Sequence, residues 1–96
     1  MDIVSEAKKL ISGDRRKAYG PVEESFQRVA NMWTAIAGQP ISREQVALMM
    51  VAFKLSREAN SHKDDNIIDA VAYLLLYEQL TNLQKTRIRP VWNLST

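Results

Sequence analysis

Three polar side chains at successive four-residue steps are the best placed in this sequence to do chemistry. Asp65, Asp69 and Tyr73 would share one face of a helix, and Asp69 lies within the apolar run IIDAVAYLLLY. Because an unpaired charge is costly to bury, a carboxylate at that position needs a cation opposite it. The spacing therefore indicates either a structural ion pair or part of a ligand site.

The helix expected just before these residues ends with the groups that could face them. Lys54, Arg57 and Glu58 lie near its end, and His62 follows in the short loop. An antiparallel hairpin of two helices would bring all these side chains to one end.

Three interpretations of this cluster follow from the residues alone. In the structural one, Asp65 caps the last helix and Asp69 pairs with Lys54 or Arg57 to lock the hairpin. In the second, Asp65, Asp69 and an acid on the facing helix hold Mg²⁺, which prefers oxygen ligands and substrate phosphates. In the third, Asp69 orients Lys54 or Arg57 towards a phosphate of a ligand.

A second basic and aromatic group lies in the connector GDRRKAYG, residues 13–20. Arg15 and its basic neighbours could bind phosphate while Tyr19 stacks on a base. The alternative is a solvated charge run with Tyr19 packed at a helix junction.

Apolar spacing and capping signals predict an all-α fold of about four helices with no strand. Ser42 with Gln45 has the form of a capping box, and Asp64 or Asp65 is expected to cap the last helix. The four helices are expected over about residues 3–12, 21–37, 42–59 and 64–83. We expect one helical domain over residues 1–84 and a basic C-terminal tail over residues 85–96.

The two last predicted helices are apolar nearly all the way round, in VALMMVAF and in IIDAVAYLLLY. A domain of this size buries one stripe per helix, and monomers seldom expose large apolar patches. We therefore expect a homodimer or higher oligomer.

Composition excludes several classes of protein. The chain has no cysteine and one histidine, so disulfides, thiolate metal sites and a multi-histidine zinc cage within one subunit are excluded. No secretory signal is expected, and the apolar runs are far shorter than the roughly 20 residues that span a bilayer. A cytoplasmic protein without a membrane partner is expected.

Basic charge is concentrated at the C-terminus, where Lys85, Arg87 and Arg89 have no acidic neighbour. The rest of the chain is near neutral, so no long nucleic acid is expected as a partner. Trp92 in this tail is interpreted as part of an arm that docks on a neighbouring subunit.

The order of these elements resembles a family of small proteins common in bacteriophages and prophages. The resemblance rests on GDR with YG, then SF and a tryptophan, then VALMM with Lys54 and Arg57, then H-x-D-D with Asp69 and Tyr73, over about residues 3–80. That family is in turn similar to the MazG-type all-α nucleoside triphosphate pyrophosphohydrolases. Those enzymes hold Mg²⁺ on a nucleotide's phosphates with E-x-x-E on one helix and E-x-x-D on the next.

Carried over to this chain, the MazG acids are only partly kept. The second motif corresponds to residues 66–69, which end in Asp69, with Asp65 as a substitute for the missing glutamate. In the first motif Glu44 has no partner three residues on, and Glu58 comes later on the same helix. Because the metal would both neutralise phosphate charge and activate water, the lost acids argue against hydrolysis.

The resemblance implies a MazG-like helical bundle that binds a nucleotide. We expect a phage-type protein that sequesters a nucleotide without turnover and without a cofactor, blunting a host nucleotide signal in the host cytoplasm. The expected ligand-binding residues are Arg15, Tyr19, Lys54, Arg57, His62, Asp69 and Tyr73.

Two alternatives stand beside this hypothesis. One is a Mg²⁺-dependent pyrophosphohydrolase with Asp65, Asp69 and either Glu44 or Glu58 as ligands, and with His62 assisting proton transfer. The other is a structural or protein-interaction oligomer.

Overall fold

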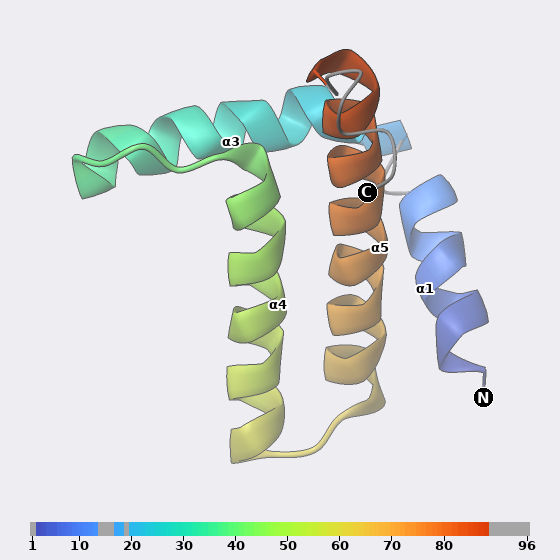
Figure 1. Ribbon diagram of the computed structural model, residues 1–96. Coiled ribbons are helices and arrows are strands. Elements are labelled where there is room, and N and C mark those ends of the chain that lie inside the picture. The colour runs from blue at the N-terminus through green and yellow to red at the C-terminus, as the bar shows by residue number, and fades with distance from the viewer. Residues whose placement is uncertain (1, 14–16, 19, 89–96) are drawn as a thin grey trace.

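The protein is all-α in the part described by the computed structural model, which covers residues 2–13, 17–18 and 20–88, with side chains to residue 83. These residues form no strand, as the sequence predicts. The helices are α1 (Ile3–Ser12), α3 (Val22–Ala37), α4 (Arg43–Asn60) and α5 (Asp64–Ile88) (Figure 1). None of the described helices is long and apolar enough to cross a membrane.

The predicted helix bounds hold except at the ends of α5. This helix begins at Asp64, so Asp64 and Asp65 lie in its first turn and not at its N-cap. In the first turn their negative charge interacts favourably with the positive end of the helix dipole. It also continues to Ile88, beyond the expected end near Leu83. The reason is that residues 84–88 contain neither glycine nor proline, and the first residue able to break the helix is Pro90.

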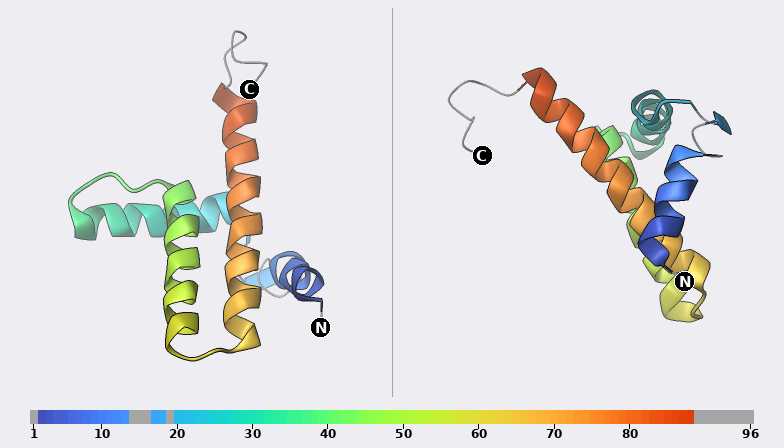
Figure 2. Two further views of the ribbon diagram at one scale, coloured as in Figure 1. Left: turned by 60° about the horizontal axis from the view of Figure 1, so that its bottom comes forward. Right: turned by 90° about the vertical axis from the view of Figure 1, so that its right-hand side faces the viewer.

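An antiparallel hairpin of α4 and α5 forms the centre of the fold, closed by the short turn at residues 61–63 (Figure 1). Helix α1 packs on the side of α5 away from α4 (Figure 2). Helix α3 crosses the far end of the hairpin, and its C-terminal half projects past α4 (Figure 1). The result is an L in which α3 is the short arm.

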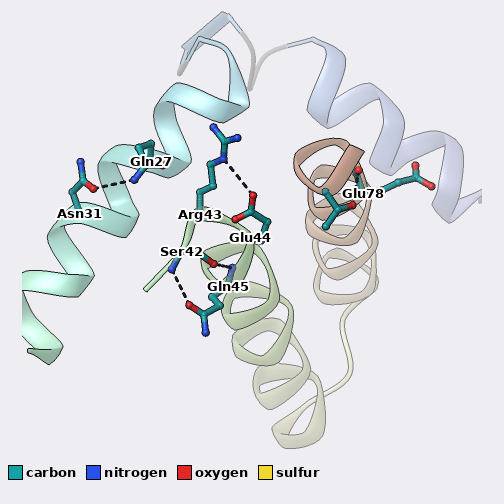
Figure 3. A network of polar contacts seen from close by, with 8 residues as sticks. Gln27, Asn31, Ser42, Arg43, Glu44, Gln45 and Glu78 are labelled. Carbon is teal, nitrogen blue, oxygen red and sulfur yellow. Dashed lines mark hydrogen bonds and ion pairs between the residues drawn. The ribbon is translucent and has the colours of Figure 1, made fainter. Parts of the chain in front are cut away.

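Local hydrogen bonds fix the corner between α3 and α4. Gly38 ends α3 in the left-handed conformation at φ 71°, and its N–H donates to the Thr34 carbonyl. The Thr34 hydroxyl accepts the Ile41 N–H at 2.8 Å. The predicted capping box then starts α4: Ser42 Oγ accepts the Gln45 N–H, and Gln45 Oε1 accepts the Ser42 N–H (Figure 3).

Two small apolar clusters hold the helices together. In the larger one, α3, α4 and α5 contribute the buried residues Val22, Phe26, Ala30, Val46, Ala47, Leu76 and Leu80. In the smaller one, Ala7 of α1 packs against Ile68 and Ala72 of α5. Helix α5 is therefore enclosed from two sides by its own chain.

The two apolar helices differ in how much of their surface the chain covers. The run at 67–77 lies between α1 and α4, and in it Leu74 is the exposed large apolar residue. In contrast α4 buries Val46 and Ala47 but leaves Leu48, Phe53 and other apolar residues about half exposed. The apolar excess expected on both helices is thus found mainly on α4.

Candidate functional site

The charged pair expected inside the hairpin is present. Lys54 Nζ lies 3.0 Å from Asp69 Oδ2, and the two side chains are 16% and 32% exposed. The carboxylate in the apolar run is therefore neutralised by Lys54, and the structural interpretation of Asp69 is confirmed in this respect. Arg57, the other candidate partner, is not in this ion pair.

The contacts between α4 and α5 change from apolar to polar towards the turn. Met50 and Tyr73, each four residues from a member of the ion pair, line the same cavity on the α3 side of it. On the turn side, Asn66 Nδ2 donates to Glu58 Oε1 at 3.3 Å. Lys54 and Asp69 thus lie between an apolar layer and a hydrogen-bonded one.

Glu58 is the acceptor that organises the turn. It accepts the backbone N–H of Lys63 at 3.0 Å, the amide of Asn66 and the Nδ1 of His62. Asn66 is only 6% exposed and donates as well to the Ser61 carbonyl. Sequence reasoning assigned Glu58 to a possible metal site and gave Asn66 no role of its own.

These contacts shift two pKa values in opposite directions. The Lys63 N–H, followed by the His62 ring, lowers the pKa of Glu58 below 4.5, although partial desolvation opposes this. The hydrogen bond and the charge of Glu58 raise the pKa of His62 above 6.5, with a smaller contribution from Asp64, whose Oδ1 lies 3.3 Å from Nε2.

A cavity of about 480 Å³ lies in the inner corner of the L. Its walls are aromatic and apolar, and the main ones are Phe26, Val29 and Trp33 of α3, Val46 and Met50 of α4, and Tyr73 of α5. The rings of Phe26 and Tyr73 are tilted by 39° with centroids 6.3 Å apart. Phe26 is buried in the larger apolar cluster and Trp33 packs against that cluster, and where α3 crosses the hairpin both residues also line the cavity.

Along α4, Lys54 lies one helical turn and Arg57 two helical turns beyond the cavity residue Met50. Lys54 Nζ is 5.8 Å from the centre of the Phe53 ring, and Arg57 Cζ is 5.9 Å from it. Arg28 also lines the cavity. The site therefore combines an aromatic enclosure with positive charge at its side.

The structure separates the remaining candidate residues. Glu44 lies at the start of α4, where its Oε1 is 3.4 Å from Arg43 Nε (Figure 3). This position is roughly 21 Å along the helix axis from Glu58. Asp65 is exposed in the first turn of α5. Within the described part of the chain, no three His, Asp or Glu side chains converge as metal ligands. Arg15, Tyr19 and Trp92 lie outside the described residues.

We expect Asp69→Asn to lower the free energy of unfolding by about 1–2 kcal/mol, between the values of exposed and buried ion pairs, because it leaves half-buried Lys54 unpaired. A double-mutant cycle with Lys54→Gln, measured by urea unfolding, should give a coupling of about 1 kcal/mol. The exposed Lys9–Glu6 pair, 3.4 Å long, is the matched control and should couple less. Equal coupling in the two cycles would contradict the half-buried role.

We expect the ring proton of His62, the single histidine, to titrate by NMR with a pKa above 6.5. Glu58→Gln should bring this pKa back towards 6.5, whereas Glu78→Gln, at the other end of α5, should not. Because the folded pKa is raised, the His62–Glu58 contact stabilises the fold below pH 6.5 and this contribution is lost as pH rises through the folded pKa. An unchanged His62 titration in Glu58→Gln would refute the assigned cause.

Comparison with known proteins gives relatives from bacteriophages. The chain is 32% identical over 82 residues to the Gene 55 protein of Mycobacterium phage L5, covering 83% of this chain and 53% of the relative. It is 30% identical over 79 residues to the Gene 55 protein of Mycobacterium phage D29, covering 81% and 52%. The chain thus spans about half the length of these curated relatives, and no solved structure gives a significant match.

The expected likeness to a small phage family is confirmed by these relatives and by a family model. The model matches residues 2–81, which include α1, α3, α4 and most of α5. The chain belongs to the DUF6378 family, described as a domain of unknown function.

Proposed function

We propose that this protein binds a nucleotide in the inner corner of the L and holds it without turnover. One observation carries the proposal. An aromatic cavity of about 480 Å³ is followed along α4, one to two helical turns away, by the cationic side chains of Lys54 and Arg57. Nucleotides need both features, since a base stacks on aromatic rings and its phosphates need positive charge.

The base-binding end would be the cavity between Trp33 and Tyr73. Aromatic and apolar walls with few polar groups are typical of small-molecule sites. Tyr73 is one of the ligand-binding residues predicted from the sequence, and Trp33 lines the same cavity from α3.

The phosphates would lie towards Lys54 and Arg57. The Lys54 ammonium lies 3.0 Å from the Asp69 carboxylate, so this flexible side chain is already ordered before a ligand arrives. Binding therefore costs less side-chain entropy. Arg57 lies over the Phe53 ring, which orients its guanidinium while leaving its N–H groups able to donate.

The absence of turnover follows from the charges that face Asp69. We infer a MazG-like hairpin in which Lys54 takes the place of a metal-binding carboxylate opposite Asp69, and Glu58 is engaged by the turn. A cation there repels Mg²⁺ and neutralises phosphate charge without activating water. The same geometry argues against the pyrophosphohydrolase alternative.

The relatives in mycobacteriophages support a role in infected cells. A protein that captures a nucleotide without consuming it acts by lowering the free concentration of that nucleotide. We therefore propose that the captured molecule is a host signal, and that the protein works in the host cytoplasm.

The test is retention of a panel of linear and cyclic nucleotides by the purified protein, with Mg²⁺ and with EDTA. After a size filter, both fractions are chromatographed. We expect one nucleotide to be retained intact in EDTA and recovered after denaturation. New monophosphate and pyrophosphate that form only with Mg²⁺ would replace sequestration by the enzyme alternative, and no retention at all would leave the structural alternative.

Replacement of Trp33 gives the matched variants for this test. Trp33→Leu should weaken retention on the order of 5- to 150-fold, the range for loss of one base–aromatic stack. Trp33→Phe keeps a ring and should lose much less. Circular dichroism and thermal unfolding establish that both variants are folded, so equal retention by the two would place the base elsewhere.

We further propose that two copies associate through the outer face of α4. Its large apolar residues Leu48 and Leu55 lie two turns apart on one side of the helix and are 43% and 51% exposed. Burial of such a patch against a second copy would remove apolar surface from water at roughly 25 cal/mol per Å².

Sedimentation analysis should find a dimer or larger species. Leu48→Glu with Leu55→Glu should shift it to the monomer, because charge on this flank opposes burial. Val4→Glu, on the exposed side of α1 at 46% exposure, is the control and should not dissociate it. A wild-type protein that sediments as a monomer at every concentration would disprove self-association.

A further inference from the structure

A second pocket, lined by polar residues, lies at the turn between α4 and α5. Its volume is about 300 Å³. The lining residues are Ser56, Arg57 and Asn60 of α4, Ser61 and Lys63 of the turn, and Asn66 of α5. Its available donors are two cations, two hydroxyls and the Asn60 amide, since the Asn66 amide already donates to Glu58 and to the Ser61 carbonyl. No carboxylate lines the pocket, and such a donor set suits a phosphate group.

Three carboxylates of the hairpin are engaged with other groups of the protein, whereas Asp65 is exposed in the first turn of α5. Glu58 accepts from the turn and from His62, and Asp64 lies against the same His62 ring. Asp69 is paired with Lys54. Among the described residues, Arg57 and Lys63 take part in no ion pair, so their charge is available to a ligand.

The pocket is also held in shape before a ligand arrives. The Lys63 N–H is fixed on Glu58 at 3.0 Å, and the buried Asn66 ties α5 to both Glu58 and the Ser61 carbonyl. Donors that are already positioned lose less entropy on binding than mobile ones.

We propose that this pocket binds a phosphate group without a metal ion, through Arg57 and Lys63 with the hydroxyl and amide groups around them. Resting on the nucleotide function proposed above, the pocket takes a phosphate remote from the base. Arg57 is roughly 10 Å along α4 from Met50, a wall of the aromatic cavity, from the rise per residue of the helix. Phe53 and Lys54 lie along the same helix between the two pockets.

The first experiment uses inorganic pyrophosphate as the probe, added to the ¹⁵N-labelled full chain in EDTA. Amide signals of residues 56–66 should shift in a saturable way. Arg57→Gln and Lys63→Gln should each weaken binding roughly 10-fold, the loss expected for one charge-assisted hydrogen bond. Lys8→Gln, an exposed lysine of α1, is the control and should leave the affinity unchanged.

The second experiment compares a nucleoside with its mono-, di- and triphosphate for each common base, by calorimetry in EDTA. Affinity should rise with the number of phosphates, and this rise should disappear in Arg57→Gln and in Lys63→Gln. Trp33→Leu should instead weaken the whole series.

The outcomes separate this inference from the proposed function. Pyrophosphate that binds at the turn while no nucleotide binds would support the phosphate pocket and overturn nucleotide sequestration. A nucleotide that binds with an affinity insensitive to Arg57→Gln and Lys63→Gln would overturn the phosphate pocket and leave sequestration standing. Pyrophosphate shifts confined to other regions would also overturn it.

Discussion

The ion pair between Lys54 and Asp69 is the constraint on which the rest of the structure depends. A carboxylate within an apolar helix requires a cation at the position opposite it on the facing helix. Because Lys54 lies opposite Asp69, the pair fixes how far α4 is displaced along its axis relative to α5. With that alignment, Met50 meets Tyr73 on one side of the pair and Glu58 meets Asn66 on the other. Apolar enclosure and polar turn are therefore consequences of one electrostatic requirement.

Glu58 gives the turn its electrostatic character. Its two carboxylate oxygens accept hydrogen bonds from the Lys63 N–H, the Asn66 amide and the His62 ring, all within the protein. The two cations beside it, Arg57 and Lys63, are left facing a pocket without carboxylates. Glu58, a metal ligand in the pyrophosphohydrolase alternative, is thus engaged by the turn, and the proposal of binding without turnover rests in part on this.

The thin core explains why the proposed nucleotide site and the proposed self-association surface lie so close together. Helix α3 crosses only one end of the hairpin, where it contributes Val22, Phe26 and Ala30 to the larger cluster, and a cavity lies beside that cluster in the corner. Helix α4 buries little beyond Val46 and Ala47. Its remaining apolar surface divides between the cavity wall and the outer face proposed to meet a second copy.

The sequence by itself determined the local structure, because caps, helix breakers and apolar spacing act over a few residues. It predicted the all-α fold, the capping box at Ser42, the hairpin and the pairing of Asp69 with a cation. Only the tertiary structure decided what depends on angles between helices: that Trp33 lines a cavity and that α1 covers α5. Apolar periodicity states which face of a helix is buried, but not which helix covers it or at what crossing angle, and these two quantities make the site.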